Sequence, residues 1–362
     1  MKTKAVFPGK YIQGKGAINE LPELIKSLAN KGLLLGSKRV IDQIIPKYAS
    51  SITQEDIVFD VFNGECCEDE ISRVLMNLEI SKANIIIGMG GGKVIDTAKI
   101  VADRASIPVI VVPTIASTDA PTSGCAVTYA SGGVFERVHY QKMNPTAVLV
   151  DLEILADAPS RFLVSGMGDA LATWFEAHSC HQTQSMNECG GLSTLAGLHI
   201  ARLCYDTLLE YGYQAKMANE NHLITPAFEF IVEANTLLSG IGFESSGLAA
   251  AHAIHNGLTV LEETHSYFHG EKVAFGTLAG LFLTGVSPKE ISIVFDFCDI
   301  VGLPTTLADV GIIKADRSKL MIAADKVCQT GSSIFHETSE MNPEKVLNAM
   351  LMADAYGRDR LK

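Results

Sequence analysis

The chain has 362 residues, of which 47% are hydrophobic and 19% are charged, and its formal net charge is −12. This length and composition predict a globular protein of two domains with large apolar cores. The acidic balance and the lack of any basic run argue against nucleic acid or an anionic membrane surface as a partner, because both require clustered Lys and Arg side chains.

The amino-terminal stretch, residues 1–14, has no apolar core or small-residue cleavage site of the kind that signal peptides have. No uninterrupted apolar segment approaches the roughly 20 residues needed to span a bilayer. The eight cysteines are scattered, and the one adjacent pair, Cys66 and Cys67, forms neither a metal motif nor a disulfide framework. We therefore expect free, mostly buried thiols and a cytoplasmic protein.

Up to Asp151, short β-rich runs alternate with segments whose apolar residues recur three and four positions apart. This alternation predicts a parallel sheet with helical crossovers, an arrangement typical of nucleotide-binding domains. A small hairpin is expected from Ala126 to His139, turning through residues 131–133. The predicted strands are Gly32 to Leu35, Ile57 to Phe62, Asn84 to Met89, Pro108 to Val112 and Ala147 to Asp151, and the predicted helices are Ala17 to Ala29, Val40 to Tyr48, Glu68 to Leu78 and Lys93 to Arg104.

The predicted strand Asn84 to Met89 runs directly into Gly90-Gly91-Gly92-Lys93 and then into a helix. Glycines let the backbone approach a ligand, and the unpaired N–H groups of a helix amino terminus attract phosphate. The turn matches neither of the two standard phosphate-binding motifs, and a tight connection is the alternative interpretation. Its position after a buried strand favours a pyrophosphate site.

The next predicted strand ends in a polar loop, Pro113 to Gly124, which contains five hydroxyl side chains and the carboxylate of Asp119. Ligands of open α/β sheets bind at the carboxyl ends of the parallel strands. Twelve residues without regular structure are unusual in a compact domain unless they bind something. A long, ligand-free connection remains the alternative.

Beyond Gly166 long helical patterns dominate, which predicts an all-helical second domain. The predicted domains are residues 1–160 and 161–362, joined by a linker-like stretch around Asp157 to Gly168. Asp169 is expected in the first turn of a helix, where a carboxylate is most often only favourable to the helix dipole. The predicted helices are Asp169 to Cys180, Gly190 to Tyr211, Thr225 to Gly240, Ser246 to Ile254, Val273 to Leu283, Pro288 to Cys298 and Pro343 to Leu361.

Four of the ten histidines lie between Gly242 and Gly276. His252 and His255 share one face of an Ala-rich helix, and His269 precedes an amphipathic run near a helix start. Two histidines and one carboxylate hold a divalent metal and leave a coordination position open. Ordinary solvated or hydrogen-bonded histidines are the alternative, and Asp169 is the candidate third ligand.

Five segments in this order resemble the zinc-dependent glycerol dehydrogenases of the iron-containing alcohol dehydrogenase superfamily. They are GMGGGKVIDTAK, VPTIASTDAPTS, GMGDALATWFEA, GFESSGLAAAHAIHNGLT and HGEKVAFGTL. The resemblance covers nearly the whole chain. It implies an amino-terminal dinucleotide-binding α/β domain followed by a helical metal-binding domain, the dehydroquinate synthase-like fold, which agrees with the division predicted from the pattern.

The resemblance also implies the roles of individual residues. The zinc ligands would be Asp169, His252 and His269, Asp119 would touch the substrate, and His255 and His265 stay unassigned. The residues implied at the pyrophosphate are Gly91, Gly92, Lys93, Val94, Ile95 and Asp96, and those at the nicotinamide half are Thr114, Ile115, Ala116, Ser117, Ser123, Cys125 and Tyr129.

Two positions depart from the family pattern. The iron-preferring branch has a histidine ligand four residues after the aspartate, whereas this chain has Thr173, which favours zinc. In this family an aspartate usually stands at the end of the strand that corresponds to Gly32 to Leu35 and binds the adenosine ribose, whereas this chain has Gly36-Ser37-Lys38 there. NAD is therefore the expected cofactor, but Ser37 and Lys38 leave NADP open.

The implied activity is oxidation of glycerol, or a similar vicinal diol, to the hydroxyketone by hydride transfer to NAD, with zinc acting as a Lewis acid. A homo-oligomer, often an octamer in this family, is expected. The alternatives are the same site acting on a hydroxy-ketone, a 2-hydroxy acid or a phosphorylated polyol, a lyase reaction like that of dehydroquinate synthase, and a catalytically silent nucleotide-binding protein. Few cations flank the predicted ligands, Lys272 being the nearest in sequence, which disfavours a phosphorylated substrate.

Overall fold

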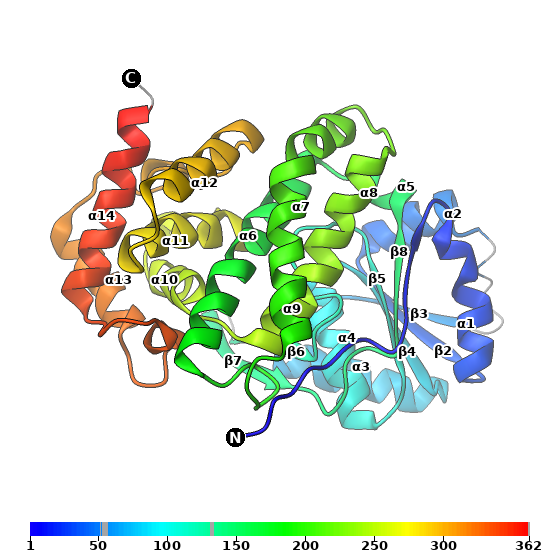
Figure 1. The fold of residues 1–362 in the computed structure, drawn as a ribbon. Coiled ribbons are helices and arrows are strands. Elements are labelled where there is room, and N and C mark those ends of the chain that lie inside the picture. Colours follow the sequence, from blue (N-terminus) through cyan, green and yellow to red (C-terminus); the bar gives the residue numbers. More distant parts are fainter. Residues whose placement is uncertain (51, 53–56, 131–133, 361–362) are drawn as a thin grey trace. The chain divides into compact units, whose positions relative to one another are not determined.

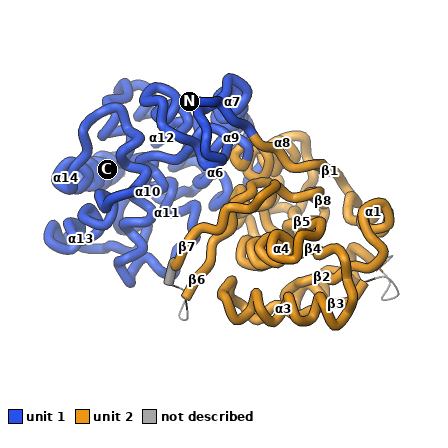
Figure 2. The backbone as a smooth tube through the Cα atoms, turned by 90° about the horizontal axis from the view of Figure 1, so that it is seen from below, with its two compact units in different colours: residues 1–5, 163–216, 241–362 blue, residues 6–162, 217–240 orange. Residues whose placement is uncertain are grey.

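The computed structural model describes residues 1–50, 52, 57–130 and 134–360. It divides into two compact units (Figure 2). The helical unit comprises residues 1–5, 163–216 and 241–362, and the sheet unit comprises residues 6–162 and 217–240. Among the described residues, no helix combines the length and the apolar character that a membrane crossing requires.

The sheet unit is built on six parallel strands in the order β1-β8-β5-β4-β2-β3 (Figure 1). The inner strands are buried on both faces, which explains their uninterrupted apolar sequences. The strands are β1 (Tyr11–Gly14), β2 (Gly32–Gly36), β3 (Ile57–Val61), β4 (Ile85–Gly90), β5 (Val109–Pro113) and β8 (Ala147–Asp151).

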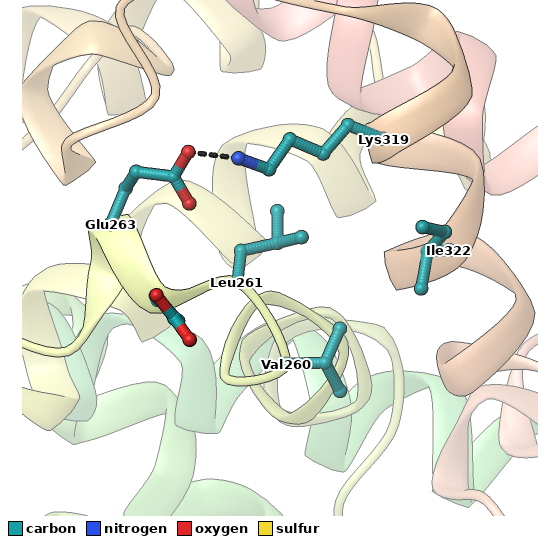
Figure 3. A pocket seen from close by; sticks show the side chains of 6 residues that line it. Val260, Leu261, Glu263, Lys319 and Ile322 are labelled. Carbon is teal, nitrogen blue, oxygen red and sulfur yellow. Dashed lines mark hydrogen bonds and ion pairs between the residues drawn. The ribbon is translucent and has the colours of Figure 1, made fainter.

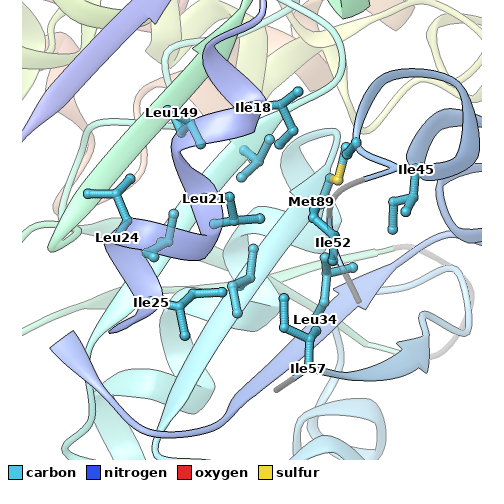
Figure 4. Packing of buried hydrophobic residues seen from close by; sticks show 14 of the residues in the cluster. Ile18, Leu21, Leu24, Ile25, Leu34, Ile45, Ile52, Ile57, Met89 and Leu149 are labelled. Atoms are coloured by element: carbon cyan, nitrogen blue, oxygen red, sulfur yellow. The ribbon is translucent and has the colours of Figure 1, made fainter. Parts of the chain in front are cut away.

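Helices cover both faces of this sheet. Successive side chains of a strand point to opposite faces of the sheet. On β4, the side chains of Ile85, Ile87 and Met89 join the apolar core that includes α1 (Figure 4). On the opposite face, Gly88 lies against Ala98 of α4. The helical segments of this unit up to residue 162 are η1 (Ala17–Glu20), α1 (Leu21–Leu28), η2 (Val40–Ile44), α2 (Ile45–Tyr48), α3 (Glu68–Ser81), α4 (Gly92–Ala105) and α5 (Leu152–Ala156).

The predicted hairpin is formed by β6 (Cys125–Ala130) and β7 (Val134–Tyr140), which pair antiparallel. Its predicted turn, residues 131–133, lies outside the described residues. The backbone N–H of Val127 donates to the Asp96 carboxylate at 3.0 Å, which ties the hairpin to α4.

The helical unit contains most of the second half of the chain. The helical segments from residue 160 onward are α6 (Ser160–Thr183), α7 (Leu195–Glu220), α8 (Pro226–Glu233), the π-helical η3 (Ala234–Leu238), α9 (Ser239–Ser246), α10 (Ala250–Leu258), η4 (Glu262–Thr264), α11 (His269–Leu283), α12 (Pro288–Val301), η5 (Ala308–Val310), α13 (Arg317–Val327), η6 (Ser333–His336) and α14 (Pro343–Arg360). Of these, α8 and η3 belong to the sheet unit.

Strand β1 and helix α13 are among the elements that were not predicted. Strand β1 is only four residues long and half-buried, and α13 has a mixed polar sequence with a weak apolar face. Both are too short or too polar to show a clear period in the sequence. The eight cysteines are free as expected, four of them buried.

The prediction around Asp169 was wrong in its local structure. Helix α6 begins at Ser160, so Asp169 lies in the middle of the helix rather than in its first turn, and the expected linker is largely helical. The glycines at positions 166 and 168 suggested a helix start, whereas both lie buried within α6.

The units also differ from the predicted domains, because residues 217–240 belong to the sheet unit. Polar side chains hold this segment there. The Asn235 amide donates to the carbonyl of Ala116 at 3.0 Å, and the Thr122 hydroxyl donates to the carbonyl of Thr236 at 2.7 Å. Such contacts between distant segments cannot be deduced from local periodicity.

Candidate active site

The three predicted metal ligands meet in the helical unit. One potential donor atom from each of Asp169, His252 and His269 lies within 4.8 Å of the other two. Oδ1 of Asp169 is 3.3 Å from Nε2 of His252 and 3.1 Å from Nε2 of His269. The ligands come from α6, α10 and α11, so the cluster exists only where these three helices pack together.

Glycines beside two of the ligands permit the close crossing of α6 and α11. A Cβ atom on Gly168 would lie 2.4 Å from the carbonyl oxygen of Gly270, and one on Gly270 would lie 1.8 Å from the carbonyl oxygen of Ser165. Larger residues would therefore push the helices apart. Gly168 precedes Asp169 and Gly270 follows His269, so the closest backbone contact is next to the ligand pair.

Glu176, which is almost fully buried, contacts the candidate ligand His252. Its Oε2 lies 2.6 Å from Nδ1 of His252, while its Oε1 accepts the backbone N–H groups of Ala249 and His252, each at 2.9 Å. Glu176 stands seven residues after Asp169 on α6, which is two helical turns, so one face of α6 provides both carboxylates. The sequence interpretation missed this residue, although that spacing was the available signal.

His269 has a corresponding partner. Its Nδ1 lies 3.0 Å from Nε2 of His255, and Nδ1 of His255 lies 3.1 Å from Oδ1 of Asn256. His255, which the sequence left unassigned, is therefore in contact with a candidate ligand. His265 is exposed and instead places Nε2 2.9 Å from the carbonyl oxygen of Thr259, near the end of α10.

Charge is concentrated at this cluster. Burial alone would raise the pKa of Asp169, but the charges of His269 and His252 and their hydrogen bonds hold it well below its usual range. Burial opposes the charge on His252, yet Glu176 and Asp169 raise its pKa well above the ordinary value. Burial lowers the pKa of His255, and the nearby charges of His269 and Lys272 lower it further.

These residues fit a divalent metal ion. The donor set is one carboxylate oxygen and two imidazole nitrogens, which is a three-ligand arrangement found in catalytic zinc sites and leaves an open position. The Asp169 side chain is 1% exposed while that of His269 is 39% exposed, so the cluster is buried on one side and open on the other. Both imidazoles have Nδ1 hydrogen-bonded, which leaves Nε2 directed at the cluster.

The glycine-rich turn lies in the sheet unit between β4 and α4. Gly88 packs against α4, since a Cβ atom there would be 2.6 Å from Cβ of Ala98. At Gly92, in contrast, the nearest atom to an added Cβ is the Thr118 hydroxyl oxygen at 3.9 Å. The backbone at the amino terminus of α4 is thus open to a ligand, and its first N–H groups have no partner within the helix.

The predicted pyrophosphate residues are not equivalent in the structure. Val94 and Ile95 are buried, so only their backbone could face a ligand. The carboxylate of Asp96 holds Val127 of the hairpin. Lys93 is exposed, pairs with Glu65 at 2.7 Å, and lies 5.1 Å from the centre of the Tyr129 ring. Their part in cofactor binding stays a prediction.

The polar loop after β5 is held in place by buried polar groups. Thr114 donates its backbone N–H to the carbonyl of Gly90 at 3.0 Å, which joins the loop to the glycine-rich turn. The Asp119 carboxylate accepts the hydroxyl of Ser239 at 2.7 Å. Ser123 and Ala116 are buried, whereas Ile115, Ser117, Cys125 and Tyr129 are partly exposed.

A buried lysine that the sequence interpretation missed fastens the far end of this loop. Lys99 of α4 is 1% exposed. Its ammonium group donates to the carbonyl oxygens of Ala120, at 2.9 Å, and Cys125, and lies 3.5 Å from the Ser123 hydroxyl. The loop therefore has a fixed shape next to the open turn, as a binding loop requires.

A shallow pocket elsewhere in the helical unit lacks such chemistry (Figure 3). It lies beside the end of α10, with apolar walls from Val260, Leu261 and Ile322 and an ion pair between Glu263 and Lys319. None of the three metal-ligand candidates lines it. The functional interpretation therefore rests on the ligand cluster and the glycine-rich turn.

Known proteins are similar to this chain in sequence and in fold. The family model described as iron-containing alcohol dehydrogenase matches residues 8–152. A glycerol dehydrogenase of Thermotoga maritima is 50% identical, over 99% of both chains. The chain belongs to the iron-containing alcohol dehydrogenase family. Within this family, a glycolaldehyde reductase of Halobacterium salinarum is 43% identical over 97% of both chains.

Solved structures of family members agree. The crystal structure of a probable glycerol dehydrogenase from Sinorhizobium meliloti superimposes with a TM-score of 0.93, at 46% identity and over 99% of both chains. The resemblance recognised from five sequence motifs and the predicted fold are thereby confirmed: a parallel-sheet unit and a helical unit with the family fold.

Proposed function

We propose that this protein oxidises glycerol, or a similar vicinal diol, to the corresponding hydroxyketone with NAD and a zinc ion. The observation that supports this most directly is the convergence of Asp169, His252 and His269 in a member of a dehydrogenase family. Full-length similarity to glycerol dehydrogenases supports the substrate class. In the reaction, a carbinol C–H bond breaks, its hydride reduces the nicotinamide, and the hydroxyl proton is released.

In this proposal the metal would be held by the Asp169 carboxylate and the Nε2 atoms of His252 and His269. A zinc ion bound there supplies Lewis-acid chemistry, which lowers the pKa of a hydroxyl group. The absence of a fourth protein ligand at Thr173 supports zinc over iron. The exposed side of His269 gives a small polar substrate access to the cluster.

The sheet unit would bind the dinucleotide. The open backbone at Gly92 and the amino terminus of α4 suit the pyrophosphate, and the loop fixed by Lys99 suits the nicotinamide half. Asp119 is proposed to orient the substrate, with Ser239 fixing its carboxylate. Strand β2 is followed by Ser37 and Lys38, so NADP is included as a second cofactor in the test, although NAD is preferred in the proposal.

The first experiment measures the initial rate of NAD reduction with glycerol and with 1,2-propanediol at alkaline pH. The rates are compared for the purified enzyme, the chelator-treated enzyme, and the treated enzyme after zinc is restored, with NADP in parallel. We expect activity on both diols that is lost on chelation and returns with zinc. Turnover that survives complete metal removal would refute the metal-assisted mechanism.

Glycolaldehyde reduction is a second candidate, because the relative bearing that name is 43% identical over nearly the whole chain. The same enzyme preparation is assayed with glycolaldehyde and NADH. If kcat/KM for glycolaldehyde is far above that for the diols and zinc is still required, the proposed metal site stands, but glycolaldehyde becomes the proposed substrate.

We also propose a cytoplasmic location and a homo-oligomeric assembly. Eight free cysteines support a reducing compartment. Large apolar side chains exposed along α7, such as Leu195 and Leu203, are consistent with a subunit contact. Light scattering of the purified protein tests the assembly.

A further inference from the structure

Each metal-ligand histidine has a hydrogen-bond partner at the nitrogen that faces away from the cluster. For His252 the partner is the Glu176 carboxylate, 2.6 Å from Nδ1, and for His269 it is His255, whose Nε2 is 3.0 Å from Nδ1. A neutral imidazole has one N–H group and one lone pair. Its partner at Nδ1 therefore decides whether Nε2 is free to coordinate a metal.

At His252 the assignment of the proton is unambiguous. An ionised carboxylate only accepts hydrogen bonds, so Nδ1 of a metal-binding His252 must donate to Glu176 and Nε2 has the lone pair. The other carboxylate oxygen accepts the backbone N–H groups of Ala249 and His252. These bonds fix Glu176 to the first turn of α10, the helix that bears the ligand.

At His269 the same result is reached through a chain of three side chains. The Asn256 amide oxygen accepts from Nδ1 of His255, so Nε2 of His255 has a lone pair and accepts from Nδ1 of His269. In the metal-bound enzyme Nε2 of His269 would then have the lone pair, and this nitrogen lies 3.1 Å from Oδ1 of Asp169. The His255 ring also contacts the His269 ring edge to face, with centroids 4.3 Å apart, which limits its rotation.

We propose that Glu176 and His255 are positioning residues that set the tautomer and the orientation of His252 and His269, and so determine metal affinity. This inference rests on the proposed metal site and goes beyond it, because neither residue is itself a ligand. Loss of such partners costs about 10–100-fold in metal affinity in other proteins. We expect losses of that size here.

Glu176→Gln tests the first partner. The amide has one acceptor oxygen where the carboxylate has two, so it cannot accept the α10 backbone N–H groups and the His252 imidazole in the same way. Glu337→Gln is the matched control. Glu337 also accepts from the start of α10, at Ala250 N, and from the Ser179 hydroxyl. The His252 ring instead contacts Glu176 and Asp169.

His255→Phe tests the second partner, because phenylalanine keeps an aromatic ring but accepts no hydrogen bond from Nδ1 of His269. Its control is His265→Phe, a histidine in the same segment whose ring contacts the Thr259 carbonyl and not a ligand. The two tests are independent, so a variant that fails to fold at one position leaves the other position informative.

The measurement is the zinc dissociation constant of the metal-stripped full-length enzyme, by competition with a chromophoric chelator, together with the thermal midpoint of the stripped enzyme. We expect Glu176→Gln and His255→Phe to bind zinc about 10–100-fold more weakly, while the two controls bind zinc with the affinity of the parent. If a control variant loses as much zinc affinity as its test variant, the partner has only a structural role and the proposal is wrong.

Failure of the proposed metal site would look different. In that case the parent enzyme itself would not bind zinc at one equivalent, or His252→Ala would bind it as tightly as the parent. If the parent binds zinc and loses it on His252→Ala, but Glu176→Gln and His255→Phe bind as tightly as the parent, only the positioning proposal fails.

Discussion

His252 connects the metal cluster to its support. One ring nitrogen faces Asp169 and the other faces Glu176, and its backbone N–H also bonds to Glu176. A substitution here removes a proposed metal ligand and lies outside the sheet unit, the proposed site of nucleotide binding. A substitution of His252 should therefore lower the rate of the chemical step without changing the affinity for NAD.

For His252→Ala we predict a fall of at least about 100-fold in kcat with glycerol, comparable to loss of one electrostatic contact to a transition state. Affinity for NAD, measured by calorimetry, should stay at the parent value, because the predicted nucleotide residues lie in the sheet unit. His265→Ala is the control and should keep full activity. Retained turnover in His252→Ala would disprove the metal assignment.

The connection from β4 to α4 combines two kinds of glycine. Gly88 lets the helix pack on the strand, whereas Gly92 leaves the helix amino terminus open. The two glycines are four residues apart, and a sequence pattern does not distinguish them. Only the packing shows that Gly88 has no room for a side chain, whereas the backbone at Gly92 is open.

This difference predicts opposite phenotypes. Gly88→Ala should lower the free energy of unfolding by about 1–3 kcal/mol, because its Cβ would overlap Ala98. Gly92→Ala should leave stability unchanged, since nothing lies closer than 3.9 Å, but should weaken NAD binding by roughly tenfold, about 1.4 kcal/mol. Denaturant unfolding and calorimetry measure the two effects. Equal NAD affinity in Gly92→Ala and the parent would exclude pyrophosphate binding at this backbone.

At the scale of the whole molecule, pH should act on stability through a buried carboxyl group in the helical unit. Burial raises the pKa of Glu337 to about 7, and the charge of Glu176 adds to the effect of burial. In the unfolded chain the same group loses its proton near its ordinary pKa of 4.5. Between these values the folded state binds more protons than the unfolded state, so the free energy of unfolding falls as pH rises.

We therefore predict that Glu337→Gln, which cannot ionise, becomes more stable relative to the parent between pH 4.5 and about 7. The difference should grow toward neutral pH and reach at most about 3 kcal/mol, from 1.36 kcal/mol for each pKa unit. Thermal unfolding of both metal-stripped proteins across this range measures it. Parallel stability curves would show that Glu337 does not titrate there.

Much of the sheet unit and the chemical types of the ligands could be predicted from the sequence. The inner strands are continuous apolar runs, and the glycine-rich turn and polar loop follow two of them directly. These are local signals, because burial on both faces and tight turns impose composition on neighbouring residues. His269 was likewise expected near a helix start, and α11 begins there.

Tertiary structure alone decided how distant segments meet. Asp169 reaches His269, 100 residues away, because Gly168 and Gly270 let two helices cross closely. Glu176 reaches His252 across 76 residues, and residues 217–240 pack with the sheet unit rather than the helical one. A sequence pattern records how each segment is buried, but not which segment buries it. The three residues of the cluster could therefore be predicted from the sequence, while the contacts that hold them in place could not.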